Sequence, residues 1–138
     1  MTVLAFDYGE RYIGVAVGEE ALGLAHPLET IEARDDAARM SAVAARVTEW
    51  RPERIVVGLP LAMSGERHAL TEQASAFARA VEARFGLPVT LVDERLSSAD
   101  AESRLREAGR GGRKHKSLAH PVAAQVILQD YFDAHAAS

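Results

Sequence analysis

The fold is decided by residues 3–17, which read VLAFDYGERYIGVAV. The apolar run Val3–Asp7 ends in an acid, as expected of a buried strand that reaches the edge of its sheet. Gly9 lies in the turn that follows, where glycine is suitable because it tolerates positive φ. Tyr12–Val17 is again rich in β-forming residues, so the two runs predict an antiparallel hairpin.

The rest of the chain alternates between strands and helices. Further strands are expected at Gly23–Thr30, Arg54–Gly58 and Pro88–Val92, and helices at Asp35–Trp50, Glu66–Phe85, Ser98–Ala108 and Pro121–Ala134. Three strands joined by short turns favour an antiparallel meander, and strands separated by helices favour right-handed parallel crossovers. The order β-β-β-α-β-α-β-α-α therefore predicts an α/β fold with a mixed five-stranded sheet and helices on both faces.

The composition of the 138 residues predicts one domain over 1–138 and argues against several classes of protein. The chain is 48% hydrophobic, which argues against disorder, and no apolar run approaches the roughly 18 residues of a membrane span. Because the chain has no cysteine, disulfides and thiolate sites are excluded. The N-terminal residues lack the basic segment of a signal peptide, so a cytoplasmic protein with no membrane partner is expected.

Charge is distributed unevenly along the chain. The net charge of −4 argues mildly against binding a polyanion. However, six of the 16 basic residues lie in Arg104–Lys116, and the glycine-rich segment 109–117 is predicted to be a flexible basic loop. Such a loop could clamp the backbone of a nucleic acid, or it could be an ordinary solvated surface loop. The nucleic-acid-binding candidates are Arg11, Arg110, Arg113, Lys114 and Lys116.

Three places along the chain supply candidate metal ligands. Asp7 ends the first strand, and Asp93 and Glu94 follow the fifth. Since alternation puts these last two on opposite faces, only one of them can easily share a site with Asp7. His120 is expected at the N-cap of the last helix, directly before Pro121 at its first position. For each candidate a structural role is the alternative, such as capping a turn or balancing a helix dipole.

Two carboxylates and an imidazole together predict a divalent-metal site. Carboxylate oxygens suit Mg²⁺ or Mn²⁺, and the imidazole favours Mn²⁺. Ions of this kind serve the hydrolysis of phosphoryl groups, because they neutralise the phosphate and activate water. The candidates for both metal binding and catalysis are therefore Asp7, His120 and one of the two acids that follow the fifth strand.

Four stretches of the chain resemble the YqgF/RuvX family. They are FDYG at 6–9 with IGVAV at 13–17, IVVGLPL at 55–61 with Gly65, DERLSS at 93–98 with Ala101, and AAQVILQDYF at 123–132. The match is in order and spans nearly the whole chain. The resemblance implies an RNase H-like fold, related to Holliday junction resolvases, in which the fourth strand separates the fifth from the first.

The resemblance also implies a function. It points to a nuclease that matures the 5′ end of pre-16S rRNA in the bacterial cytoplasm, on or near ribosomal particles, or that acts on branched DNA. It assigns metal binding to Asp7 and Glu94. The family pattern has an Asp at the start of the last helix, where this chain has His120, so the site loses one negative charge. A junction resolvase needs two active sites, which a homodimer would supply.

Two other functions fit parts of the sequence. The arrangement of Asp7, Gly9 and Gly14 also builds a phosphate loop in ATP-binding domains of the sugar-kinase and actin type, but those need a second similar lobe, for which 138 residues leave little room. A catalytically weakened nucleic-acid-binding or ribosome-assembly factor would keep the fold and lose one ligand, and His120 favours it. A metal-dependent nuclease that hydrolyses phosphodiester bonds is the leading prediction.

Overall fold

The computed structural model describes residues 1–60, 68–93 and 113–135. The strands are β1 (Thr2–Asp7), β2 (Tyr12–Glu19), β3 (Leu24–Glu32), β4 (Arg54–Leu59) and β5 (Val89–Asp93). The helices are α1 (Asp36–Trp50), α2 (Ala69–Phe85) and α4 (Arg113–His135). All five predicted strands are confirmed, with ends that differ by at most two residues. The helix predicted at Ser98–Ala108 lies outside the described residues.

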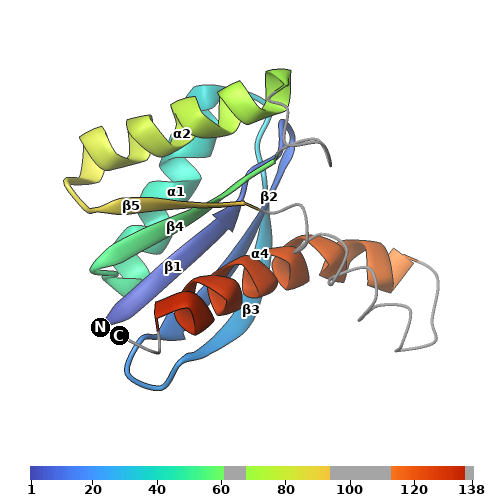
Figure 1. The fold of residues 1–138 in the computed structure, drawn as a ribbon. Coiled ribbons are helices and arrows are strands. Elements are labelled where there is room, and N and C mark those ends of the chain that lie inside the picture. Colours follow the sequence, from blue (N-terminus) through green and yellow to red (C-terminus); the bar gives the residue numbers. More distant parts are fainter. Residues whose placement is uncertain (61–67, 94–112, 136–138) are drawn as a thin grey trace.

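The five strands form one mixed sheet in the order β3-β2-β1-β4-β5 (Figure 1). β1 pairs antiparallel with β2, and β2 with β3, because short turns join these strands. β1 pairs parallel with β4, and β4 with β5, because α1 and α2 return the chain to the same end of the sheet. The expected order is confirmed, and β4 separates β1 from β5 by two strand spacings, about 10 Å.

Helices cover both faces of the sheet, as predicted (Figure 1). Successive side chains of a strand point to opposite faces, so β1 contributes to two cores. Leu4 and Phe6 belong to the core under α1 and α2, whereas Val3 and Ala5 belong to the core under α4. On the α4 side the helix contributes Ala124, Ile127, Leu128, Tyr131 and Phe132. Because β1 is buried on both faces, the position of its last residue, Asp7, is firmly held.

Local signals set the ends of α1 and α2. The Asp35 carboxylate caps α1 by accepting a hydrogen bond from the Ala38 N–H at 2.7 Å. α2 begins after His68, whose backbone N–H donates to the Thr71 hydroxyl at 3.1 Å. It ends at Gly86, which has a φ of 66° and is the predicted C-cap.

The last helix is longer than predicted. α4 begins at Arg113, so residues 113–117 are helical and the prediction of a flexible loop over 109–117 is wrong for that part, while 109–112 lie outside the described residues. Pro121 lies inside the helix, and His120 is not its N-cap. Proline lacks a backbone N–H and is best tolerated in a first turn, which explains the wrong prediction. The helix continues through Pro121 because only the hydrogen bond to the residue 117 carbonyl is lost, and the following turns pack on the sheet.

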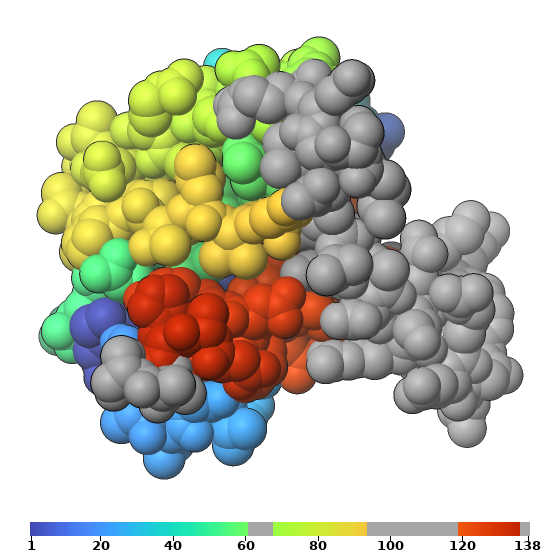
Figure 2. All heavy atoms as spheres, viewed as in Figure 1, coloured from blue at the N-terminus to red at the C-terminus, as the bar shows by residue number. Residues whose placement is uncertain are grey.

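β5 is an edge strand and forms part of the molecular surface. Figure 2 shows its atoms, in gold, as a band between α2 and α4. Leu91 of this strand is 44% exposed. Within the described ranges, no helix combines the length and apolar character that crossing a bilayer would need.

Candidate active site

Asp7 lies at the carboxyl end of β1, on the face that α4 covers. It pairs across the strands with Gly14 of β2, and alternation places it on the same face as Val3 and Ala5. Paired residues of antiparallel strands have neighbouring side-chain positions on one face of the sheet. The half-buried Asp7 therefore has a glycine as its direct neighbour on β2, which leaves room for α4 beside the carboxylate.

The backbone of α4 passes directly over Gly14. A Cβ added to Gly14 would lie 1.9 Å from the carbonyl oxygen of His120 and 3.1 Å from its Cα. Only glycine permits so close an approach of one backbone to another. The structure thus brings Asp7 and the His120 backbone, from opposite ends of the chain, to one end of the sheet and to one face.

The imidazole of His120 is stacked on the ring of Tyr12. The two ring centroids are 5.4 Å apart and the ring planes differ by 27°. Tyr12 lies two residues before Gly14 on β2, so it is on the same face of the sheet. Sequence analysis missed this role of Tyr12. A glycine inside a strand, such as Gly14, often marks the close approach of another backbone. Because Tyr12 lies on the same face of the strand as Gly14, its contact with the approaching segment could have been predicted from the sequence.

Arg11 is held by the last residue of β3. Its Nη2 donates to the Glu32 carboxylate at 3.1 Å and its Nε donates at 3.3 Å. This hydrogen bond is the main cause of the raised pKa of Arg11. The guanidinium also lies 5.4 Å from the centre of the Tyr12 ring. The Arg11 side chain remains 54% exposed beside the stacked rings, and its role in binding nucleic acid remains a prediction.

Gly9 is required in the β1–β2 turn for space. A Cβ at this position would lie 2.4 Å from the carbonyl oxygen of Tyr12. Among the described glycines, positive φ occurs at Gly23 and Gly86 and not at Gly9, so the tolerance of glycine for positive φ is not the reason for Gly9 in this turn. The tight turn brings Tyr12 back beside the end of β1.

β5 ends in Asp93, the first residue of the other acidic pair. Val92 packs in the core under α4, so Asp93 belongs by alternation to the opposite face. On the face that α4 covers, Gly58 of β4 is the cross-strand partner of Val92 of β5. The pairing of β1 with β4 continues to Asp7 on the other side of Gly58, so Gly58 lies between Val92 and Asp7. Asp93 is therefore not on the face of Asp7, and Glu94 lies outside the described residues.

The described residues supply two of the three predicted metal donors. Asp7 offers carboxylate oxygens and His120 an imidazole nitrogen, which are donors that Mg²⁺ and Mn²⁺ accept. Within 1–60, 68–93 and 113–135, no three His, Cys, Asp or Glu side chains are grouped closely enough to hold a metal ion. The donors present fit such an ion in kind, and a three-donor centre needs one further ligand from outside these ranges.

The predicted basic residues of α4 belong to the same end of the molecule. Arg113, Lys114 and Lys116 are in its first turns, which extend past the ends of the strands (Figure 1). At 1.5 Å rise per residue, the positions of Lys116 and Arg113 lie about 6 and about 10 Å along the helix axis from His120. Arg110, the remaining candidate of this group, lies outside the described residues.

Comparison with known proteins agrees with this geometry. The family model described as "RuvX: Holliday junction resolvase" matches residues 1–134. A relative from Methylobacillus flagellatus is 56% identical over 131 residues, which cover 95% of this chain and 90% of that protein. A relative from Dechloromonas aromatica is 52% identical over 132 residues, with 96% and 90% covered. Both relatives carry the provisional name pre-16S rRNA nuclease.

Solved structures show the same fold. RuvC of T. thermophilus in complex with a Holliday junction substrate has a TM-score of 0.59 at 19% identity, with 99% of this chain and 96% of that chain covered. Fowlpox virus resolvase in complex with Holliday junction DNA has a TM-score of 0.62 at 10% identity, with 97% and 98% covered. These likenesses confirm the predicted RNase H-like α/β fold. Since the family model spans nearly the whole sequence, the chain belongs to the RuvX family of Holliday junction resolvases.

Proposed function

We propose that the protein is a divalent-metal-dependent nuclease that hydrolyses phosphodiester bonds at the end of the sheet where β1 finishes. One observation carries the proposal: the carbonyl of His120 lies over Gly14, the cross-strand neighbour of Asp7. Two proposed metal donors from distant parts of the chain thus belong to one face of the sheet. Membership of a resolvase family and the names of the relatives support this function.

Asp7, Glu94 and His120 would hold the metal ion. When bound, a divalent ion neutralises phosphate charge and lowers the pKa of a water molecule. Asp7 offers a carboxylate on a strand buried on both faces, and the Tyr12 ring holds the imidazole of His120. Glu94 is preferred to Asp93 because Asp93 belongs to the face away from α4.

The proposed substrate is precursor rRNA, cut at the 5′ end of pre-16S rRNA in the cytoplasm, with ribosomal particles as partners. The names of the relatives support RNA, and the name of the family model supports branched DNA as the other substrate, for which a homodimer would provide two sites. Backbone phosphates would be bound by Arg11 and by Arg113, Lys114 and Lys116 at this end, together with Arg110, which lies outside the described residues. Such contacts position a strand and carry no sequence information.

Cleavage assays on matched panels of junction DNA, single-stranded RNA and duplexes test the proposed site. Asp7→Asn and Glu94→Gln are each expected to lower the cleavage rate about a hundredfold or more, because each removes a charged metal donor. Thermal unfolding should show that both variants remain folded. Glu10→Gln and Asp93→Asn are the matched controls and should keep wild-type rates. Undiminished cleavage by either Asp7→Asn or Glu94→Gln would remove that residue from the mechanism.

The choice of metal tests the role of His120. Manganese is expected to support faster cleavage than magnesium, because an imidazole nitrogen suits Mn²⁺ better. His120→Asp introduces the residue typical of the family and should shift the preference toward magnesium. If both proteins show the same ratio of manganese to magnesium rates, His120 is not a ligand.

A catalytically weakened nucleic-acid-binding or ribosome-assembly factor is the second candidate. The stack of His120 on Tyr12 favours it, because that contact holds the imidazole without a metal ion. This function predicts that the wild-type protein binds its nucleic acid but cleaves none of the panel with either ion. It also predicts that Asp7→Asn binds as tightly as wild type.

A further inference from the structure

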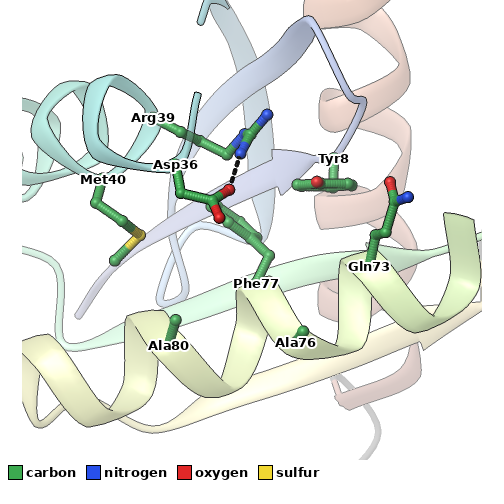
Figure 3. Close-up of a pocket in the computed structure, with 8 residues that line it drawn as sticks. All are labelled: Tyr8, Asp36, Arg39, Met40, Gln73, Ala76, Phe77 and Ala80. Atoms are coloured by element: carbon green, nitrogen blue, oxygen red, sulfur yellow. Dashed lines mark hydrogen bonds and ion pairs between the residues drawn. The ribbon is translucent and has the colours of Figure 1, made fainter. Parts of the chain in front are cut away.

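A cleft between α1 and α2 lies on the opposite face of the sheet from Asp7 (Figure 3). Its volume is about 350 Å³, which is within the range of sites for small organic ligands. The side chains that line it come from α1, α2 and the residue after β1, and include Asp36, Arg39, Met40, Gln73, Phe77 and Tyr8. None of these residues is used by the proposed metal centre.

Flat groups form one wall of the cleft. The Tyr8 ring packs against the Phe77 ring, with centroids 5.1 Å apart and an interplanar angle of 40°. The Arg39 guanidinium lies 5.4 Å from the centre of the Tyr8 ring. Aromatic rings and guanidinium groups stack favourably on planar ligands. Tyr8 is 8% exposed and Phe77 6%, so the part of the wall that faces the cleft is small and suits the edge of a flat, aromatic ligand.

Two polar atoms beside this wall are buried without a hydrogen-bond partner among the described residues. Arg39 is only 7% exposed, and its Nε is unpaired although its Nη1 pairs with Asp36 and its Nη2 donates to the Glu10 carbonyl at 2.6 Å. Oε1 of Gln73 is the second such atom. Buried polar groups are nearly always paired in native proteins, because an unmade hydrogen bond is unfavourable. Both atoms have almost no accessible surface, so a ligand in the cleft would satisfy them once the Arg39 and Gln73 side chains turn toward it.

The charges of the cleft favour a neutral ligand. The carboxylate of Asp36 forms an ion pair with Arg39, so the lining has no uncompensated charge to attract a phosphate or a carboxylate. A glutamine amide, once its side chain turns toward the cleft, pairs with the adjacent donor and acceptor on the edge of a nucleobase. We propose that this cleft binds a nucleobase, stacked beside Tyr8 and hydrogen-bonded to Gln73 and Arg39.

Two kinds of ligand present the same planar, hydrogen-bonding base to the cleft. The base belongs either to a free nucleoside or to an unpaired nucleotide of a bound strand. The proposal does not rest on the nuclease function, since the cleft and Asp7 are on opposite faces of the sheet and binding needs no metal ion. Binding should therefore be unchanged in Asp7→Asn, whatever that variant does to cleavage.

Nitrogen-15 NMR titrations of the full chain test the proposal. Adenosine, guanosine and a short single-stranded oligonucleotide are the ligands, and ribose 5-phosphate is the control without a base. The backbone signals of Tyr8 and Gln73 are expected to shift with a base-containing ligand and not with ribose 5-phosphate. Ala76→Phe fills the cleft from an exposed position of α2 and should weaken binding about tenfold or more.

Matched variants separate blocking of the cleft from damage to the helix. Ala83→Phe makes the same change at another exposed position of α2 and should bind like wild type. Gln73→Leu keeps the size of the side chain but removes the amide, and should weaken binding of the base. Shifts with nucleosides identify a free ligand, and shifts with the oligonucleotide alone identify a base within a strand. The proposal is wrong if no base shifts these signals, if ribose 5-phosphate shifts them equally, or if Ala76→Phe binds as wild type does.

Discussion

Small residues on one face of β2 determine how closely α4 approaches the sheet. Gly14, Ala16 and Gly18 alternate with larger residues and all face α4. A Cβ at Gly18 would lie 2.6 Å from the Phe132 ring, and one at Gly14 would meet the His120 backbone. Gly14 thus allows the His120 backbone to lie over the cross-strand partner of Asp7, and the proposed site depends on this packing.

Gly14→Ala is expected to destabilise the protein by about 1–3 kcal/mol, because the new methyl group forces α4 away from β2. Cleavage should fall as well, because His120 moves with the helix. Urea unfolding and cleavage rates measure the two effects. Gly23→Ala is the contrasting variant: its φ of 66° is strained for alanine, but nothing lies near the added Cβ. It should lose about 1–2 kcal/mol of stability and no activity. Full activity in Gly14→Ala would contradict the role of the close approach.

Tyr12→Leu tests whether the stacked ring positions His120. The variant loses an aromatic contact worth about 0.5–1.5 kcal/mol, so the imidazole should become mobile and cleavage should fall several-fold. Tyr12→Phe keeps the stacked ring and should keep the rate. In proton NMR spectra, the ring-current shift of the His120 imidazole should disappear in the leucine variant and persist in the phenylalanine variant. Unchanged imidazole shifts in Tyr12→Leu would show that the ring does not hold His120.

Among the elements, α4 also protects the exposed edge strand β3. The Gln129 side chain accepts from the Ala25 N–H at 3.1 Å and donates to the Gly23 carbonyl at 2.8 Å. The Gln125 amide donates to the Ala25 carbonyl at 3.1 Å. These bonds satisfy backbone groups that an edge strand would otherwise offer to another chain. Gln125 and Gln129 therefore attach the second half of α4 to β3, and they occupy backbone groups at the edge of the sheet.

Gln129→Leu should expose this edge. Two backbone groups are left without their partners, so the free energy of unfolding should fall by about 1–3 kcal/mol. Light scattering should also detect association that increases with protein concentration, because the edge of β3 becomes available for pairing. Gln129→Glu keeps the acceptor for Ala25 and removes the donor to Gly23, so it should give an intermediate decrease. A fully stable, monodisperse Gln129→Leu protein would argue against this function of the side chain.

An ion pair between the Met1 ammonium and the Glu19 carboxylate joins the start of β1 to the end of β2. Its hydrogen bond lowers the pKa of Glu19 below 4.5 and raises the pKa of the Met1 amine above 8.0. A carboxyl group with a lowered pKa stabilises the fold above its ordinary pKa and loses this effect as the pH falls through the lowered value. An amine with a raised pKa stabilises the fold below its ordinary pKa and loses this effect as the pH rises through the raised value.

The decrease in stability caused by Glu19→Gln should therefore be largest between pH 4.5 and 8.0. Urea unfolding should give values for the variant and wild type that converge as the pH falls below the lowered pKa of Glu19 and as it rises above the raised pKa of the Met1 amine. The decrease should be small, because both groups are exposed. Glu20→Gln changes the same charge at the next residue without breaking this pair, and should show a weaker dependence on pH. A difference that persists unchanged when the pH falls well below 4.5 would rule out the ion pair as its source.

Sequence predicts some of these elements better than others for physical reasons. β1 and β4 could be predicted because each strand is buried along its length, and burial leaves a continuous run of apolar residues in the sequence. The start of α4 was missed because Pro121 favours a first turn locally, whereas packing of the helix on the sheet overrides that preference. The Tyr12–His120 stack joins distant segments and depends on how α4 docks. Asp7 and His120 could be chosen as candidate metal ligands from the chemistry of their side chains, but the contact of His120 with Tyr12 could not be predicted in this way.

The whole molecule is polarised along its strands. Asp7, the His120 backbone and the first turns of α4 occupy one end, while the start of β1 and the last turn of α4 lie together at the other (Figure 1). Six basic residues lie in the segment Arg104–Lys116, although the net charge of the chain is −4. Fields between exposed charges are screened beyond about 8–10 Å at physiological salt, so this local excess, and not the net charge, determines attraction to phosphates. Because Arg113, Lys114 and Lys116 of this segment belong to the first turns of α4, a polyanion should approach the molecule from the end that carries Asp7.

Neutralising Arg113, Lys114 and Lys116 together with glutamine tests this polarity. Binding of nucleic acid should weaken uniformly across sequences, and the slope of log affinity against log salt should flatten by about 0.7–0.9 for each phosphate that is no longer neutralised. The matched control replaces Arg51, Arg79 and Arg84, exposed residues on α2 or just after α1, and makes the same change in net charge. Its salt slope should equal that of wild type, because those positions are not among the proposed phosphate-binding residues. If both triple variants flatten the slope equally, net charge governs binding and the basic start of α4 has no special role.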